Sequence, residues 1–260
     1  MKELGTRGMI PASGDRKAAE ETLDIIRELR RAFDAAGAAN AAPEALHAIR
    51  DLAKAAPGTG AFLAQTLGAG EVRIHLCGPE AVVEEAEIPG VWRLDVGGQS
   101  SVVASLLPRT VCAFIERGAE ELVETGEAPA GLFAAPAILS EVREALRALK
   151  DAPSLVREID LLRQPLGPAD MNYILATIGR GSVTVELRGF ARSRIESTRV
   201  RGLWHSRIVN DAGRALLDSL VVARIPPEVP AGADDIPGSS AKLAELEEWI
   251  ASDLRHGVFD

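Results

Sequence analysis

Residues 63–78, LAQTLGAGEVRIHLCG, align without gaps with residues 174–189, ILATIGRGSVTVELRG. Aliphatic residues and glycines recur at the same positions of the two segments. In each segment a helical pattern ends at a glycine and is followed by the alternation of a half-buried strand. The chain therefore predicts two copies of one supersecondary unit.

The similarity continues downstream of both segments. With a shift of one residue, IPGVWRLDV at 88–96 aligns with VRGLWHSRI at 200–208. A turn follows in each copy (GGQ or NDAG), and then a final strand, SVVASLLP or ALLDSLVVARIPP, that stops at proline. We expect each copy to be a helix with three antiparallel strands. Because such a unit has exposed edges and a small core, we expect the two copies to share a sheet.

Helical patterns flank and link the two copies. An apolar stripe marks RKAAEETLDIIRELRRAFDAAG, a second helix is expected from Pro43 through Leu52, and APAILSEVREALRALKDAPS links the copies. The segment SSAKLAELEEWIASDLRHG predicts a last helix with Ser240 as its N-cap. The predicted organisation is a helical segment at 1–56, a first repeat at 57–125, a helical connector at 126–164, and a second repeat with the last helix at 165–260.

The fold class that follows is α+β, with two related helix-plus-antiparallel-sheet repeats packed together and with flanking and linking helices. Of the 260 residues 47% are hydrophobic and 26% charged, which is typical of a soluble globular protein. The formal net charge of −9 argues against attraction of the whole chain to nucleic acid or membranes. No signal peptide or membrane-length apolar run is evident, so we expect a cytoplasmic protein.

Two cysteines, Cys77 and Cys112, are too few for a disulfide framework or a closed metal cage. His75 and Cys77 form an H-x-C pair on one strand face, but the residues aligned with them are Glu186 and Arg188. With no third ligand nearby, a surface strand face is favoured over a metal site. We expect no metal and no cofactor.

The segment RGLWHSR at 201–207 holds a tryptophan and a histidine. Trp204 recurs as Trp92, in phase with aliphatic residues, so both are predicted to pack in the core. His205 points to the other face, and no Ser/Cys nucleophile motif or second histidine accompanies it, as catalysis by this histidine would need. An enzyme stays open as an alternative if a deep pocket holds His205 or His75 beside a carboxylate.

Arginine is concentrated between residues 180 and 207. Seven arginines stand there against two glutamates, a formal charge of +5. The segment predicts a binding face for an acidic or phosphate-bearing partner, with neutralisation by acidic neighbours as the alternative for many of the arginines. A nucleic-acid or anion-binding module is the alternative function, although nucleic acid is disfavoured because Trp204 is expected to face inward.

The second copy resembles a known family. The stretches PLGPADMNYILATIGRGSVTVELRGFARSRIESTRVRGLWHSRIVN, ALLDSLVVARIPPEVP and LAELEEWI resemble the HupH/HyaF/HoxQ-type NiFe-hydrogenase expression/formation proteins. The resemblance implies a non-catalytic assembly chaperone in hydrogenase maturation. Its implied partners are the iron–sulfur small-subunit precursor and other maturation proteins, and a homo-oligomer is left open. Family members often carry a cysteine after the Arg–Gly pair, where this chain has Ser193.

The predicted partner-binding residues combine this resemblance with the arginine cluster. Those that match the family pattern are Arg188, Arg194, Ser197, Thr198 and Asn210. Those added from the cluster are Arg192, Arg199, Arg201 and Arg207.

Overall fold

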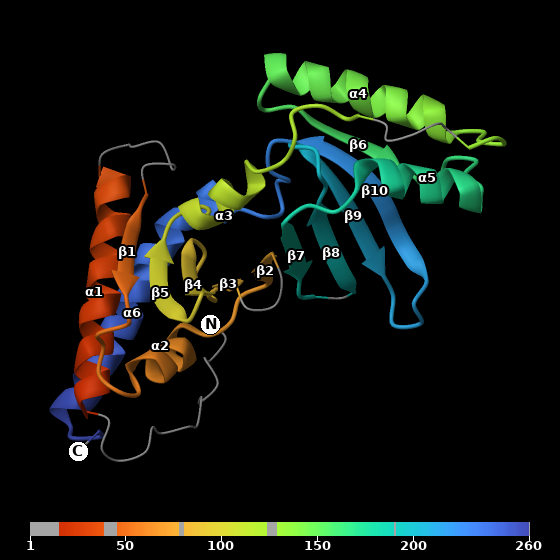
Figure 1. Ribbon diagram of the computed structural model, residues 1–260. Coiled ribbons are helices and arrows are strands. Elements are labelled where there is room, and N and C mark those ends of the chain that lie inside the picture. The colour runs from red at the N-terminus through yellow and green to blue at the C-terminus, as the bar shows by residue number, and fades with distance from the viewer. Residues whose placement is uncertain (1–15, 39–45, 78–80, 124–128, 190, 260) are drawn as a thin grey trace.

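The computed structural model describes residues 16–38, 46–77, 81–123, 129–189 and 191–259 (Figure 1). Its helices are α1 (Arg16–Ala38), α2 (Thr59–Leu67), α3 (Arg109–Ile115), α4 (Ala135–Asp151), α5 (Pro168–Ile178), the short 3-10 helix η2 (Ala233–Asp235) and α6 (Ile236–Arg255). Its strands are β1 (Ala48–Asp51), β2 (Val72–Leu76), β3 (Ala81–Glu85), β4 (Val91–Val96), β5 (Gln99–Ala104), β6 (Val156–Asp160), β7 (Val183–Leu187), β8 (Arg192–Ser197), β9 (Leu203–Val209) and β10 (Ala215–Ala223). Within these described ranges, every helix is too short or too polar to cross a bilayer.

The strands form one antiparallel sheet in the order β1-β5-β4-β3-β2-β7-β8-β9-β10-β6. The pairing of β2 with β7 joins its two halves, and Ile74 stands opposite Val185, the residue aligned with it in the sequence. The two aligned strands therefore share a sheet, as we expected, and the α+β class is confirmed.

The order of elements is the same in the two halves: α1-β1-α2-β2-β3-β4-β5 and α4-β6-α5-β7-β8-β9-β10. The prediction of three strands per copy was wrong, because β3 and β8 also pair. Their sequences, AVVEE and RSRIES, carry too much charge for a clear apolar alternation. Ser193, at the position where family members often carry a cysteine, lies in strand β8.

The helix predicted from Pro43 through Leu52 was also wrong. Residues Ala48–Asp51 form β1, which pairs with β5 at one edge of the sheet, and β6 occupies the opposite edge within the segment predicted as a helical connector. Backbone pairing with β5 overrides the helical spacing of these few apolar residues. Pro43 itself lies outside the described residues.

Matching glycines and tryptophans shape both halves. Gly68 and Gly179 end α2 and α5 with φ of 68° and 58°, a left-handed region that favours glycine. Trp92 and Trp204 are buried, and their indole N–H groups donate to backbone carbonyls at 2.9 and 3.0 Å, respectively. The predictions of glycine stops and core tryptophans are confirmed.

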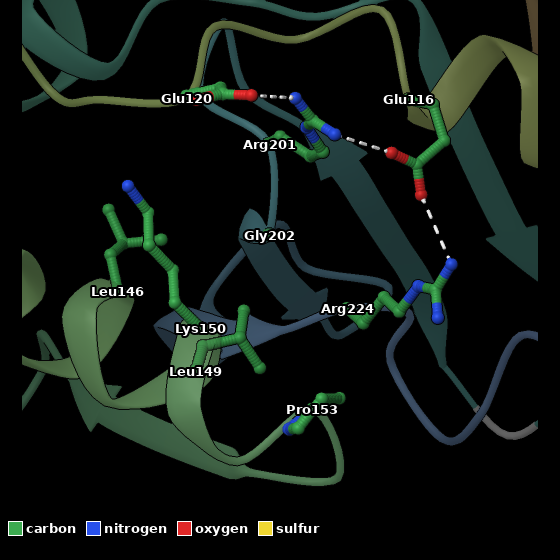
Figure 2. Close-up of a pocket in the computed structure, with 9 residues that line it drawn as sticks. All are labelled: Glu116, Glu120, Leu146, Leu149, Lys150, Pro153, Arg201, Gly202 and Arg224. Atoms are coloured by element: carbon green, nitrogen blue, oxygen red, sulfur yellow. Dashed lines mark hydrogen bonds and ion pairs between the residues drawn. The ribbon is translucent and has the colours of Figure 1, made fainter.

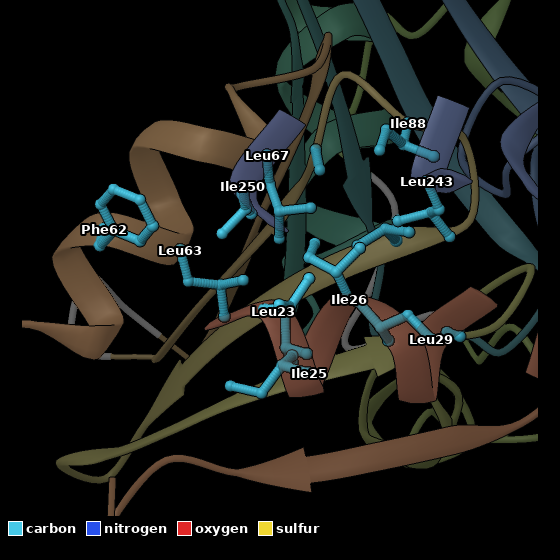
Figure 3. Packing of buried hydrophobic residues seen from close by; sticks show 14 of the residues in the cluster. Leu23, Ile25, Ile26, Leu29, Phe62, Leu63, Leu67, Ile88, Leu243 and Ile250 are labelled. Atoms are coloured by element: carbon cyan, nitrogen blue, oxygen red, sulfur yellow. The ribbon is translucent and has the colours of Figure 1, made fainter. Parts of the chain in front are cut away.

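The sheet has one apolar face and one face that helices cover in part. Both tryptophans lie in the core of the apolar face, with Ile74, Val185 and residues of α3. On the other face, α1, α2 and α6 cover part of the first half, and α4 and α5 cover part of the second (Figure 1). Figure 3 shows side chains of α1, α2 and α6 meeting in one core.

The last helix, α6, belongs to the core of the first half. It packs along α1, and its Leu243 and Ile250 are buried there, although the sequence analysis grouped this helix with residues 165–260. Ser240 is not its N-cap, since the helix begins at Ile236. The Ser240 hydroxyl instead donates to the Asp34 carboxylate of α1.

Candidate functional site

Seven charged residues form a row across seven neighbouring strands, each opposite the next in the sheet register. Because side chains alternate along a strand, this row lies on the face opposite the buried tryptophans. Near the helices the same face is apolar and covered, for example at Val91 and Leu203. We call these residues the charged row: Arg93, Glu84, Arg73, Glu186, Arg194, Arg207 and Asp218.

In the first half of the sheet the charges of the row are closely paired. The Glu84 carboxylate lies 2.7 Å from Arg93 and 3.3 Å from Arg73. It also contacts Arg188, one of the predicted residues, at 3.1 Å. Arg73, Glu84 and Arg93 were not among the predicted site residues, because strand β3, which carries Glu84 between the two arginines, was not predicted.

In the second half the row contains two like charges side by side. Arg194 of β8 stands opposite Arg207 of β9, and both side chains are half exposed. Their nearest acidic contacts are long, 3.4 Å from Arg194 to Glu196 and 3.7 Å from Arg207 to Asp218. Arg192 is exposed on the same face of β8.

His205 has a partner that the sequence did not reveal. Its Nε2 lies 2.7 Å from Asp218 Oδ1, and the histidine is buried. The register explains the contact, since Asp218 of β10 stands opposite Arg207, which lies two residues beyond His205 on the same face of β9. The partner is a carboxylate, not a nucleophile or a second histidine, and the contact holds this carboxylate beside Arg207.

A polar cleft of about 620 Å³ opens where β2, β7 and β8 meet. His75 and Cys77 line it together with Glu186, Arg194 and Ser197. His75 Nε2 lies 3.6 Å from Glu186 Oε2, which is too long for a hydrogen bond. In the described part of the chain no three His, Cys, Asp or Glu residues group as metal ligands would. The arrangement can hold a polar group by charge and hydrogen bonding.

Four of the predicted partner-binding residues use their polar groups within the protein. The Ser197 hydroxyl bonds both backbone groups of Val183, and that of Thr198 bonds those of Val200. Asn210 accepts from the Arg214 backbone N–H in the β9–β10 turn. The Arg199 side chain donates to the carbonyls of residues 176 and 177 at the end of α5, where a cation is favourable.

Arg201 lies in a second pocket, of about 410 Å³ (Figure 2). Its guanidinium contacts Glu116 at 2.8 Å and Glu120 at 3.0 Å. Arg224 reaches the same Glu116 at 3.6 Å, so the charges of this pocket are largely paired among themselves. Leu149 of α4 points toward Gly202 across the pocket. The structure thus separates Arg201 from the arginines of the charged row.

Asp170, which the sequence analysis did not single out, fixes the start of α4 from α5. One carboxylate oxygen accepts the backbone N–H groups of residues 133, 134 and 135 at 2.9–3.0 Å, and the other accepts that of Gly167. These bonds, the one from Ala135 foremost, lower the pKa of Asp170. Its position in the first turn of a predicted helix, shortly after Gly167 and Pro168, is the sequence feature that could have identified it.

Comparison with known proteins relates this chain to one family. The sequence-family model described as HupH hydrogenase expression protein, C-terminal conserved region, matches residues 132–250 of this chain. The hydrogenase expression/formation protein HoxQ of Azotobacter vinelandii is 34% identical over 195 residues, covering 72% of this chain and 69% of that protein. HupH of Rhizobium leguminosarum bv. viciae is 30% identical over 201 residues, covering 72% and 68%. A solved structure, the hydrogenase expression protein HupH from Thiobacillus denitrificans ATCC 25259, is 29% identical with a TM-score of 0.40, over 43% of this chain and 92% of that one.

Proposed function

Because this chain belongs to the family of HupH, HoxQ and HyaF hydrogenase expression/formation proteins, we propose that it is an accessory protein of hydrogenase maturation. It acts as an assembly chaperone that binds the precursor of the iron–sulfur small subunit. Its role is binding, and it needs neither a metal nor a cofactor of its own.

One observation carries the binding proposal, the open charged face of the second half of the sheet. Arg192, Arg194 and Arg207 are exposed there on the neighbouring strands β8 and β9, Arg188 is exposed just after β7, and Arg194 lines the polar cleft. A rigid sheet holds these cations in fixed relative positions, which favours recognition of one complementary surface over general adhesion. The partner therefore presents an acidic patch, even though this chain is acidic overall.

A nucleic-acid partner fits this face less well. Single-stranded nucleic acid is held by aromatic side chains on which bases stack. Both tryptophans of the sheet are instead buried in the core of the opposite face, with exposed fractions of 0% and 1%. Among the residues that the structure describes, the cationic face offers charge without an aromatic stacking platform, which favours a protein partner.

Co-purification with a tagged small-subunit precursor tests the proposal. Arg194→Glu is expected to weaken capture at least about tenfold, since it reverses a charge at the centre of the face. Arg163→Glu is the matched control, because Arg163 is 87% exposed and lies outside the face, and it should bind as the unaltered protein does. Circular dichroism and urea unfolding verify that both variants fold. Failure of the unaltered protein to retain the precursor contradicts the proposal.

A further inference from the structure

We propose that Arg194 and Arg207 together receive a carboxylate side chain of the partner, so that the segment bound on this face is an acidic peptide. This inference rests on the proposed function and names the chemistry of the partner at the same site. It follows from the order of charges along the charged row.

The signs of the row alternate from Arg93 as far as Arg194. Arg93, Glu84, Arg73, Glu186 and Arg194 read plus, minus, plus, minus, plus, each directly opposite the next. The next position, Arg207, is again positive. Like charges directly opposite each other destabilise a sheet, whereas opposite charges stabilise it. The row thus contains one unfavourable step, at its most exposed arginines.

Nearby carboxylates do not resolve this step. Glu196 is 3.4 Å from Arg194, but its closer contact is with Arg180, at 2.5 Å. Asp218 is 3.7 Å from Arg207, but its closer contact is with His205, at 2.7 Å. Each of these carboxylates has its shortest contact elsewhere, so neither forms a close ion pair with Arg194 or Arg207.

The geometry suits a carboxylate between the two arginines. Side chains opposite each other in an antiparallel pair have Cβ atoms about 4.5–5.5 Å apart, so both guanidinium groups can reach one anion. Both are half exposed, with exposed fractions of 49% and 50%, which leaves donors free for charge-assisted hydrogen bonds. An incoming carboxylate restores the alternation of signs that the row lacks.

Peptide binding tests the inference directly. The probes are a synthetic dodecapeptide of alternating glutamate and threonine, its glutamine–threonine counterpart, and an oligothymidylate of similar length. We expect the acidic peptide to bind, the glutamine peptide to bind at least about tenfold more weakly, and Arg207→Thr to weaken the acidic peptide by a similar factor. Tighter binding of the oligonucleotide than of the acidic peptide overturns the inference, as does full peptide binding by Arg207→Thr.

The melting temperature gives a second test, because replacing an arginine with a purely structural role would lower it. Arg207→Thr removes a like-charge step, so its melting temperature should equal or exceed that of the unaltered protein. Arg93→Thr is the matched control in the paired part of the row, where Arg93 lies 2.7 Å from Glu84. It should lower the melting temperature and leave peptide binding unchanged. Equal losses of stability in the two variants overturn the inference.

The precursor assay separates this inference from the proposed function. If the precursor co-purifies equally with Arg207→Thr and with the unaltered protein, the acidic-pair inference fails while the chaperone proposal stands. If the precursor is never retained but the acidic peptide binds through Arg194 and Arg207, the partner proposal fails while the assignment of the site stands.

Discussion

The two halves of the sheet share their order of elements and differ in what covers and charges them. Three helices, α1, α2 and α6, close the first half, and its part of the charged row is paired around Glu84. Two helices, α4 and α5, close the second half, and its row contains the step between Arg194 and Arg207. The same order of elements thus occurs in both halves, but only the second half sets two half-exposed arginines directly opposite each other.

The two buried tryptophans give the largest expected effect. Trp92→Ala and Trp204→Ala should each lower the free energy of unfolding by about 3–5 kcal/mol, because each removes a large core side chain. Urea unfolding at neutral pH measures both. If one of the two variants loses less than about 1 kcal/mol, the two tryptophans do not contribute equally to stability. The structural match between the halves then does not extend to the energetics of their cores.

Two glycines in matching positions come next. A Cβ at Gly70 would lie 2.4 Å from the Ala86 carbonyl oxygen, and one at Gly181 would lie 2.3 Å from that of Thr198. Alanine at either site should cost about 1–3 kcal/mol, since backbone must move aside. Gly60→Ala in helix α2 is the control, because its Cβ would meet nothing within 4 Å and it should be neutral or stabilising. Thermal unfolding of the three variants distinguishes these outcomes.

The smallest expected effect is on stability at acidic pH. It concerns the hydrogen bonds that join the short helix of each half to its long helix. Thr59 and Asp170 stand at the same distance before the glycines that end α2 and α5. Thr59 donates to Glu21 of α1, whereas Asp170 itself accepts from the start of α4. The pKa of Glu21 is lowered chiefly by the Ala56 amide, and that of Asp170 chiefly by the Ala135 amide.

A lowered pKa in the folded state means that the ionised carboxylate stabilises the protein. For Asp170 this contribution is complete above its ordinary value of 3.8 and is lost as the pH falls through the lower folded value. Stability measured against pH should therefore fall less steeply in acid for Asp170→Asn, and likewise for Glu21→Gln, than for the unaltered protein. Parallel acid limbs in all three proteins would show that these carboxylates do not carry the dependence.

Much of this fold was predictable from the paired segments alone. Val72, Ile74 and Leu76 alternate with polar residues, and the glycine before them recurs, so strand, helix stop and core face all followed. Strands β3 and β8 were not predicted, because their sequences are rich in charged residues and lack a clear alternation of apolar and polar residues. Edge strand β1 was missed because four residues gain their conformation from pairing with β5, which no local pattern encodes.

The candidate site was predictable by residue type and not by arrangement. The excess of arginine was plain in the sequence, but the register that sets Arg194 against Arg207 depends on pairing between strands. The contact of His205 with Asp218 could not be predicted for the same reason, because it depends on the register between β9 and β10. Arg199 could not be separated from its neighbours, because its role at the end of α5 arises from the turn that brings it there.

The position of α6 has a consequence for the order in which the protein can fold during synthesis. Leu243, Ile250 and Phe259 complete the core around α1 and α2, and the ring of Phe259 packs edge-on against that of Phe62 at 5.4 Å. All residues of the second half are made before these three. The second half can therefore pack on the ribosome while the first half waits for the last helix, so a stalled or shortened translation product would leave the earlier-made half open.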